Sequence, residues 1–288
     1  MNWLDLLAQA FTMPFMVRAA IVLGALTLAA GVIGVFVNLR GLEFMTDGLT
    51  HAVFPGIAAG FALAGNGGLF VGAAIAAALA TVVLTILTHR NLTSDTAVAI
   101  ILTAMFSVGV VFVSRSRHAT GSLEQLLFGH LFTISPLEMW LTVGVCLVAL
   151  VMVLVTVRGQ LFAAFDAPGA KAAGYGALIH TLVLNVAIAC VVVAASIAIG
   201  NLLVLAVLVI PGGVSRMWAR GLTGIFTGAL IFAIIMSLAG LLGAFTVSVG
   251  LDVAIPGGAA IAVVLVAGYL LSLLIRTIIR PRARGGVS

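Results

Sequence analysis

Residues 19–38 read AAIVLGALTLAAGVIGVFVN, a run of twenty residues without a charged side chain. An α-helix rises about 1.5 Å per residue, so a helix of this length crosses the roughly 30 Å hydrocarbon core of a bilayer. The rest of the chain has the same character, because 63% of its 288 residues are hydrophobic and only 7% are charged. A typical soluble domain is about 25% charged. We therefore predict an all-α, polytopic transmembrane bundle that forms a single domain over residues 1–288.

Apolar segments of this kind recur along the whole chain, and two of them contain a proline. Pro55 lies in the second segment and Pro211 in the seventh, where a proline removes one helical hydrogen bond. Either segment could be a broken or re-entrant helix, so eight full spans is an alternative to nine. Residues 123–134 are too short to cross and are expected at the interface. The nine segments are 19–38, 46–64, 68–88, 96–114, 137–157, 178–198, 201–217, 222–243 and 254–275.

The basic residues predict an orientation for this bundle in the cell membrane. With the N-terminus outside and the C-terminus in the cytoplasm, ten of the thirteen Lys and Arg residues are cytoplasmic, as the positive-inside rule favours. The reverse orientation would place those ten outside. The ten are Arg40, Arg90, Arg158, Lys171, Arg216, Arg220, Arg276, Arg280, Arg282 and Arg284, and the outer three are Arg18, Arg115 and Arg117.

The two ends of the chain are expected to lie at the membrane surface. Residues 1–14 suggest an interfacial amphipathic helix, and residues 276–288 form a basic tail on the cytoplasmic side. The net charge of +5 would suggest nucleic acid in a soluble protein. Here the basic residues lie between apolar runs, so we expect anionic lipid and no nucleic acid as their partner.

An acid and an imidazole interrupt the apolar stretch 45–60, which reads MTDGLTHAVFPGIAAG. Asp47 and His51 are four residues apart, so on a helix they share one face with Cβ atoms roughly 5–6 Å apart. A central Asp costs at least about 2.5–3.5 kcal/mol in lipid, and such residues usually mark a transport pathway. Carboxylate and imidazole ligands suit Mn, Zn or Fe, so we predict a metal-binding pair. The structural alternative is a hydrogen bond between helices.

Helix-weakening residues follow this pair and recur late in the chain. Pro55 and Gly56 come one turn after His51, and they free backbone carbonyls that a cavity or a neighbouring helix must satisfy. Pro211 precedes two glycines and is expected to break its helix near the cytoplasmic side. We therefore treat Pro55, Gly56 and Pro211 as candidate gate or hinge positions.

The longest polar-tolerant connection is RGQLFAAFDAPGAKAAGYG, residues 158–176. Asp166 can cap a short helix whose first turn contains Pro168, and Gly174 or Gly176 can end it. Such a helix would lie on the cytoplasmic surface, either as a partner's docking site or as a structured loop without a partner. The aromatic side chains that it would offer are Phe162, Phe165 and Tyr175.

The sequence lacks the common catalytic motifs. Its only lysine, Lys171, is followed by Ala, so the Gly-Lys-Ser/Thr of a phosphate-binding loop is absent. No Ser-x-x-Lys, G-x-S-x-G or H-E-x-x-H pattern occurs either. We therefore expect a protein that is not an enzyme and does not hydrolyse ATP by itself.

Whether His118 or His130, on the expected outer face, contributes to metal entry stays open.

Six segments, in the right order, resemble the permease subunit of the manganese/zinc/iron (ABC-3 type) ABC importers. The similarity covers most of the chain. One departure is Thr46-Asp47-Gly48-Leu49-Thr50-His51, where the family usually has Gly-Asp-Ala-Leu-Ser-His. The segments are FMVRAAIVLGALTLAAGVIGVFVNLRGLEFMTDGLTHAVFPGIAAG (15–60), SDTAVAIILTAMFSVGVVFVS (94–114), LEQLLFGHLFTIS (123–135), FDAPGAKAAGYG (165–176), IGNLLVLAVLVIPGGVSR (199–216) and GLDVAIPGGA (250–259).

This resemblance implies one half of a type II-like importer. Two permease copies would form one pathway, with Asp47 and His51 lining the route of a divalent metal ion and no cofactor permanently bound. An extracellular metal-binding protein would deliver the ion, and two separate ATPase subunits would dock on the 158–177 loop. The rival hypotheses are a stand-alone, proton-coupled secondary transporter that uses the pair as a proton relay, and a membrane scaffold without transport. The implied coupling residues are Phe165, Asp166, Gly169, Ala170 and Gly174.

Overall fold

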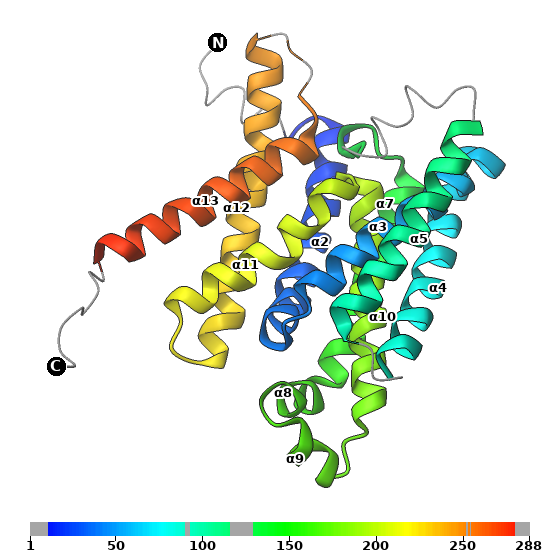
Figure 1. Cartoon of the computed structure of the whole chain (residues 1–288). Helices are drawn as coiled ribbons and strands as arrows, with labels where there is room; N and C mark the ends of the chain where they lie inside the picture. Colours follow the sequence, from blue (N-terminus) through cyan, green and yellow to red (C-terminus); the bar gives the residue numbers. More distant parts are fainter. Residues whose placement is uncertain (1–10, 90–92, 116–128, 252, 254, 280–288) are drawn as a thin grey trace, which may run out of the picture.

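The computed structural model describes residues 11–89, 93–115, 129–251, 253 and 255–279, and within these ranges the regular elements are all helices. Each of the nine expected apolar segments coincides with one helix, and successive long helices run in alternating directions (Figure 1). These helices are α2 (Pro14–Arg40), α3 (Glu43–Ala64), α4 (Leu69–His89), α5 (Ser94–Arg115), α7 (Pro136–Val155), α10 (Ala177–Ile199), α11 (Val204–Trp218), α12 (Leu222–Leu251) and α13 (Gly257–Ile279). The short elements are α8 (Val157–Phe165), α9 (Ala167–Ala172) and the 3-10 turns η1 (Gly65–Gly68), η2 (Leu131–Thr133) and η3 (Asn201–Leu203).

Six helices in the described ranges are long and apolar enough to cross a membrane: α2, α4, α7, α10, α12 and α13. Two shorter apolar helices cover Asp95–Gly109 and Val204–Trp218. The chain is therefore a multi-pass helical membrane protein.

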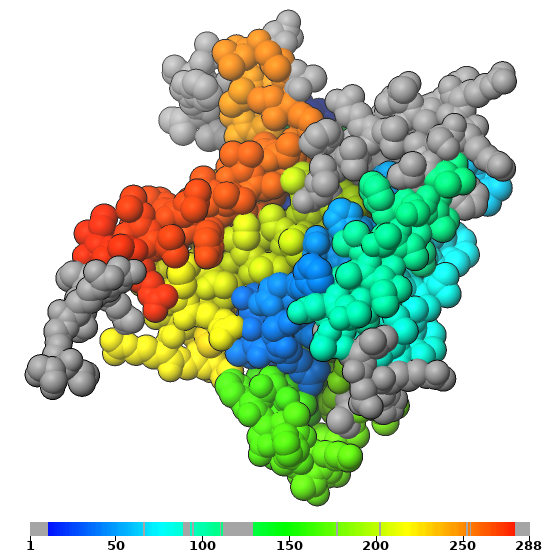
Figure 2. All heavy atoms as spheres, in the orientation of Figure 1, coloured from blue at the N-terminus to red at the C-terminus, as the bar shows by residue number. Residues whose placement is uncertain are grey.

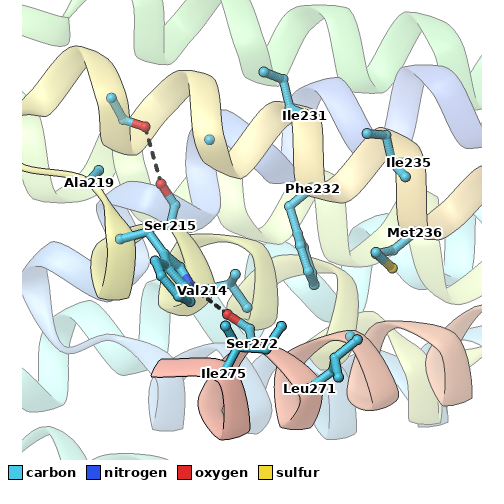
Figure 3. Close-up of a pocket in the computed structure, with 14 residues that line it drawn as sticks. Val214, Ser215, Ala219, Ile231, Phe232, Ile235, Met236, Leu271, Ser272 and Ile275 are labelled. Atoms are coloured by element: carbon cyan, nitrogen blue, oxygen red, sulfur yellow. Dashed lines mark hydrogen bonds between the residues drawn. The ribbon is translucent and has the colours of Figure 1, made fainter. Parts of the chain in front are cut away.

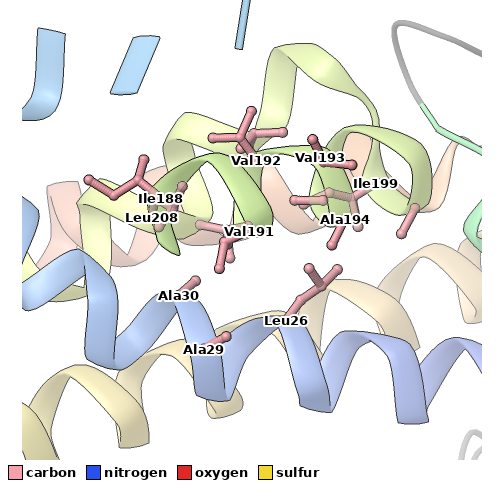
Figure 4. Packing of buried hydrophobic residues seen from close by; sticks show 14 of the residues in the cluster. Leu26, Ala29, Ala30, Ile188, Val191, Val192, Val193, Ala194, Ile199 and Leu208 are labelled. Atoms are coloured by element: carbon pink, nitrogen blue, oxygen red, sulfur yellow. The ribbon is translucent and has the colours of Figure 1, made fainter. Parts of the chain in front are cut away.

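The core of the bundle lies where α2 and α10 cross. Leu26, Ala29 and Ala30 of α2 lie opposite Val191 and Ala194 of α10 (Figure 4), and all five are at most 1% exposed. Without a hydrophobic driving force between helices in lipid, small side chains stabilise association because they let backbones approach closely. The alanines at this crossing supply that close approach.

Pro55 and Pro211 do not interrupt their helices. The helix α3 runs unbroken through Pro55, and α11 continues through Pro211 and the two following glycines to Trp218. The expected helix break near Pro211 is therefore wrong, and residues 201–217 do not form a re-entrant hairpin.

The turn of α11 that ends at Pro211 packs closely against α2. A Cβ atom at Gly34 of α2 would lie 1.9 Å from the carbonyl oxygen of Leu208, so the two backbones touch. Asn38 Nδ2, also on α2, donates a hydrogen bond of 3.0 Å to the carbonyl oxygen of Val209. Both contacts lie within residues 207–211, the turn whose closing hydrogen bond the proline removes, so α2 packs against α11 at that turn.

Several expected features lie outside the described residues. They include most of the interfacial helix expected at 1–14, the basic tail from 280 onwards, and residues 123–128 of the short interfacial segment. His118 also belongs to this part of the chain.

Candidate functional site

Asp47 and His51 lie on the accessible stripe of an otherwise buried helix. From Met45 to Ile57, every residue of α3 is buried except Asp47, His51 and Gly56. The helix reaches the surface between α11 and α5 on the face shown in Figure 2. The two ionisable side chains between Met45 and Ile57, Asp47 and His51, therefore both lie on the part of α3 that neighbouring helices leave uncovered.

The two side chains of this Asp47–His51 pair are close but not hydrogen-bonded. His51 Nε2 lies 3.7 Å from Asp47 Oδ1, and the side chains are 33% and 32% exposed. This separation exceeds hydrogen-bonding distance. Neither side chain bonds to another helix within the described residues. The geometry therefore gives no support to the alternative that the pair joins helices.

The Asp47–His51 pair can offer two ligands to one ion. Two ligands on a tetrahedral ion, each about 2.1 Å from the metal, stand roughly 3.4 Å apart, so the 3.7 Å pair needs only a small adjustment. Within the described residues, His, Cys, Asp and Glu form no group of three or more that could hold a metal. One copy of the chain thus supplies two side-chain ligands and needs others to complete a site.

A backbone oxygen near the pair also lacks its usual partner. In an α-helix the N–H of residue 55 bonds to the carbonyl of residue 51, and Pro55 has no N–H. The carbonyl oxygen of His51 therefore lacks its ordinary helical hydrogen bond. It belongs to the same residue as the imidazole. Carbonyl oxygen is an acceptable ligand for divalent ions such as Mn.

The candidate hinge positions Pro55 and Gly56 pack tightly between two helices. A Cβ at Gly56 would lie 2.3 Å from the carbonyl oxygen of Gly72 on α4, and a Cβ at Gly109 of α5 would lie 3.0 Å from Pro55. Close packing of this kind fixes the segment in one position. Pro211 is likewise buried, within the contact of α11 with α2.

The 158–176 connection folds into a hairpin of α8 and α9 that projects beyond the ends of the long helices (Figure 2). As expected, Asp166 caps α9, accepting a 2.9 Å hydrogen bond from the Gly169 N–H. Gly174 follows α9 with φ +87°, in the left-handed region that favours glycine. Phe165 is 67% exposed, whereas Ala170 is buried.

The expected aromatic surface is smaller than the sequence suggests. Phe162 is exposed, but Tyr175 is half-buried between Phe162 and His180, with ring centroids 5.9 and 5.6 Å away. Tyr175 therefore anchors the hairpin to α10, and Phe162 and Phe165 are the aromatic residues that it presents outward.

A buried amide, which the sequence analysis missed, ties this hairpin to α10. Gln160 of α8 is fully buried, and its Nε2 donates a 2.7 Å hydrogen bond to the carbonyl oxygen of His180. Gly159 lies so close to the His180 ring that an added Cβ would stand 2.0 Å from its Nε2. A lone glutamine in a short polar loop gives no sequence signal for such a contact, because its partner lies twenty residues away on another helix.

His130 belongs to a different part of the molecule from the Asp47–His51 pair. Its Nε2 lies 3.5 Å from Glu138 Oε1 at the start of α7, and the side chains are 19% and 10% exposed. Glu138 also completes the capping box of α7 with Ser135. This contact gives His130 a structural partner that the sequence alone did not indicate.

Comparison with known proteins places this chain among transport permeases. The model of the ABC 3 transport family matches residues 12–276. The manganese import system permease protein ScaB of Streptococcus parasanguinis is 30% identical over 262 residues, covering 91% of this chain and 90% of the relative. The manganese transport system membrane protein MntC of Halalkalibacterium halodurans is 32% identical over 224 residues, covering 77% and 75%. The solved structure of PsaBC from Streptococcus pneumoniae, in complex with a Fab, matches with a TM-score of 0.79 and 26% identity over 93% of this chain and 94% of that one.

Proposed function

Because this chain belongs to the ABC 3 transport family, as expected from its sequence, we propose that it forms the membrane pathway for a divalent transition-metal ion in an ABC importer. It is a permease subunit, and ATP hydrolysis belongs to a separate ATPase subunit. The relatives above are manganese permeases, so manganese is the first cargo to test, with zinc and iron as alternatives.

The position of the Asp47–His51 pair is the observation that supports this function most directly. We infer that two copies of the chain pair across the face where α3 is uncovered. Each copy would then bring one carboxylate and one imidazole to a shared pathway, which makes four side-chain ligands. Ligands that assemble between two moving subunits can bind an ion and release it, as conduction requires.

The α8–α9 hairpin is the proposed docking site for the ATPase. It projects from the bundle, is capped at Asp166, and presents Phe162 and Phe165 outward. The Gln160–His180 contact joins it to the first turn of α10, the helix whose later residues lie in the core of the bundle. Movement of the hairpin would therefore reach the helices around the pathway and drive alternating access. An extracellular metal-binding protein would deliver the ion to the opposite side.

Metal uptake by cells that express the complete importer tests the pathway. Asp47→Asn and His51→Ala should each lower manganese uptake at least about tenfold, because loss of a ligand typically costs more than loss of its supporting contacts. Asp95→Asn removes an exposed acid at the start of α5 and is the matched control. Normal uptake by either pair variant at normal expression would refute the assignment. Uptake without the ATPase would favour the proton-coupled alternative.

We infer nine spans, with the N-terminus outside and the hairpin in the cytoplasm. The alternating helix directions place η1 and the α8–α9 hairpin at opposite ends of the bundle (Figure 1). In a chain that lacks Cys146 and Cys190, Gly67→Cys in η1 should react with an impermeant thiol reagent on intact cells. Lys171→Cys in α9 should react only after permeabilisation. Labelling of Lys171→Cys in intact cells would invert the bundle and rule out the docking site.

A further inference from the structure

A groove of about 640 Å³ opens between α11, α12 and α13 (Figure 3). Its walls are apolar side chains from all three helices, and Phe232 projects into its centre. The volume lies within the range of small-molecule sites, roughly 300–1,000 Å³. The lining residues include Val214, Trp218, Ile231, Phe232, Leu271 and Ile275.

The few polar groups in the groove are already bonded to the protein. Trp218 Nε1 donates a 2.6 Å hydrogen bond to Ser272 Oγ, and Ser215 Oγ donates to the carbonyl oxygen of Ile225. A polar occupant would find no free partner on these groups and would lose its own hydration. The groove therefore suits a hydrocarbon chain.

Two arginines follow lining residues at one end of the groove. Arg220 directly follows the lining residue Ala219, and Arg276 directly follows the lining residue Ile275. Neither guanidinium has a hydrogen bond or an ion pair within the described residues, whereas Arg216 donates to the carbonyl oxygen of Asn38. The helices α11, α12 and α13 contain no Asp or Glu. The two free cations thus have no acid on these helices to balance them.

We propose that the groove between α11, α12 and α13 binds an anionic phospholipid, with an acyl chain along its apolar walls and the phosphate at Arg220 and Arg276. Basic pockets between transmembrane helices bind acidic head groups, and tryptophan is enriched at the level where head group and acyl chain meet. Trp218 lines the groove and lies two residues before Arg220 in the sequence. The bound lipid would join the C-terminal ends of α11 and α13.

Charge argues against a second copy of the chain as the occupant. A twofold axis along the membrane normal keeps equivalent residues at the same membrane surface. Pairing through this groove would therefore gather Arg220 and Arg276 of both copies without an acid from these helices. Lipid phosphate supplies the missing negative charge.

Quenching of Trp218 fluorescence by brominated lipid tests the proposal. Trp3→Phe and Trp140→Phe leave Trp218 as the single tryptophan of the full chain in its assembled complex. The protein is placed in phosphatidylcholine nanodiscs that contain an equal mole fraction of either brominated phosphatidylglycerol or brominated phosphatidylcholine. We expect phosphatidylglycerol to quench at least about threefold more effectively, and salt to reduce this preference because it screens exposed charges.

Variants separate charge from folding. Arg220→Gln with Arg276→Gln should abolish the preference, whereas Arg220→Lys with Arg276→Lys should keep most of it. Arg158→Gln removes an exposed cation from α8 and should leave it unchanged. Equal quenching by both lipids would mean ordinary bilayer contact and would overturn the proposal. Absence of quenching by either lipid would mean that protein covers the groove, and would overturn it too.

Discussion

The Asp47–His51 pair and the α8–α9 hairpin are built in opposite ways. The pair consists of two ionisable side chains on a helix that is otherwise buried, and its geometry depends on the chemistry of those side chains. The hairpin is exposed, and its shape depends on a cap, a left-handed glycine and one buried amide. The first region should therefore be sensitive to ligand identity, and the second to backbone conformation.

The largest expected effect is that His51→Ala abolishes the function of the Asp47–His51 pair and leaves that of the hairpin intact. Manganese uptake should fall at least about tenfold, because the imidazole ligand is lost. The ATPase should still co-purify with the permease, because the hairpin is unchanged. Loss of co-purification would show that the variant disturbs the whole bundle, and the comparison would then fail.

At the hairpin, Asp166→Lys should release the ATPase subunit in a pull-down. An N-cap is worth about 1 kcal/mol, roughly fivefold in an equilibrium, and lysine also reverses the charge at the start of α9. Asp166→Asn is the matched control, because asparagine caps as well as aspartate. If Asp166→Lys keeps the ATPase bound, with metal-stimulated ATP hydrolysis intact, the docking site lies elsewhere.

Gln160→Met tests whether the hairpin drives the bundle through α10. Methionine fills a similar volume but cannot donate to the His180 carbonyl, so the variant should lose about 1 kcal/mol of stability with the hydrogen bond. We expect the ATPase to stay bound while metal uptake per ATP hydrolysed falls severalfold. Unchanged coupling in a stable variant would assign Gln160 a packing role only.

The smallest expected effect concerns glycine conformation. Gly174→Ala forces a side chain into the left-handed region and should cost about 1–2 kcal/mol, read as faster proteolysis of the hairpin. Gly144→Ala in α7 has open space around it and should stabilise the chain by about 0.5–1 kcal/mol. Equal rates of hairpin proteolysis in the two variants would show that the conformation of the hairpin does not depend on a left-handed residue at Gly174.

The sequence determined the features that depend on neighbours along the chain. Hydrophobic runs placed nine helices, four-residue spacing placed Asp47 beside His51, and capping chemistry placed Asp166 and Gly174 in the hairpin. The family followed from motifs of the same local kind. Each of these signals acts within a few residues, so a linear pattern carries it.

Only the tertiary structure decided what covers each helix. The helices α10 and α13 are both strongly apolar. In an apolar 18-residue stretch of each helix, however, 78% is buried inside the protein in α10 and only 22% in α13. Lipid and protein interior are both apolar, so hydropathy cannot distinguish a core helix from a lipid-facing one. For the same reason the sequence could not foresee that α11 packs against α2 at the turn before Pro211, that Gln160 bonds to His180, or that an apolar groove lies between α11, α12 and α13.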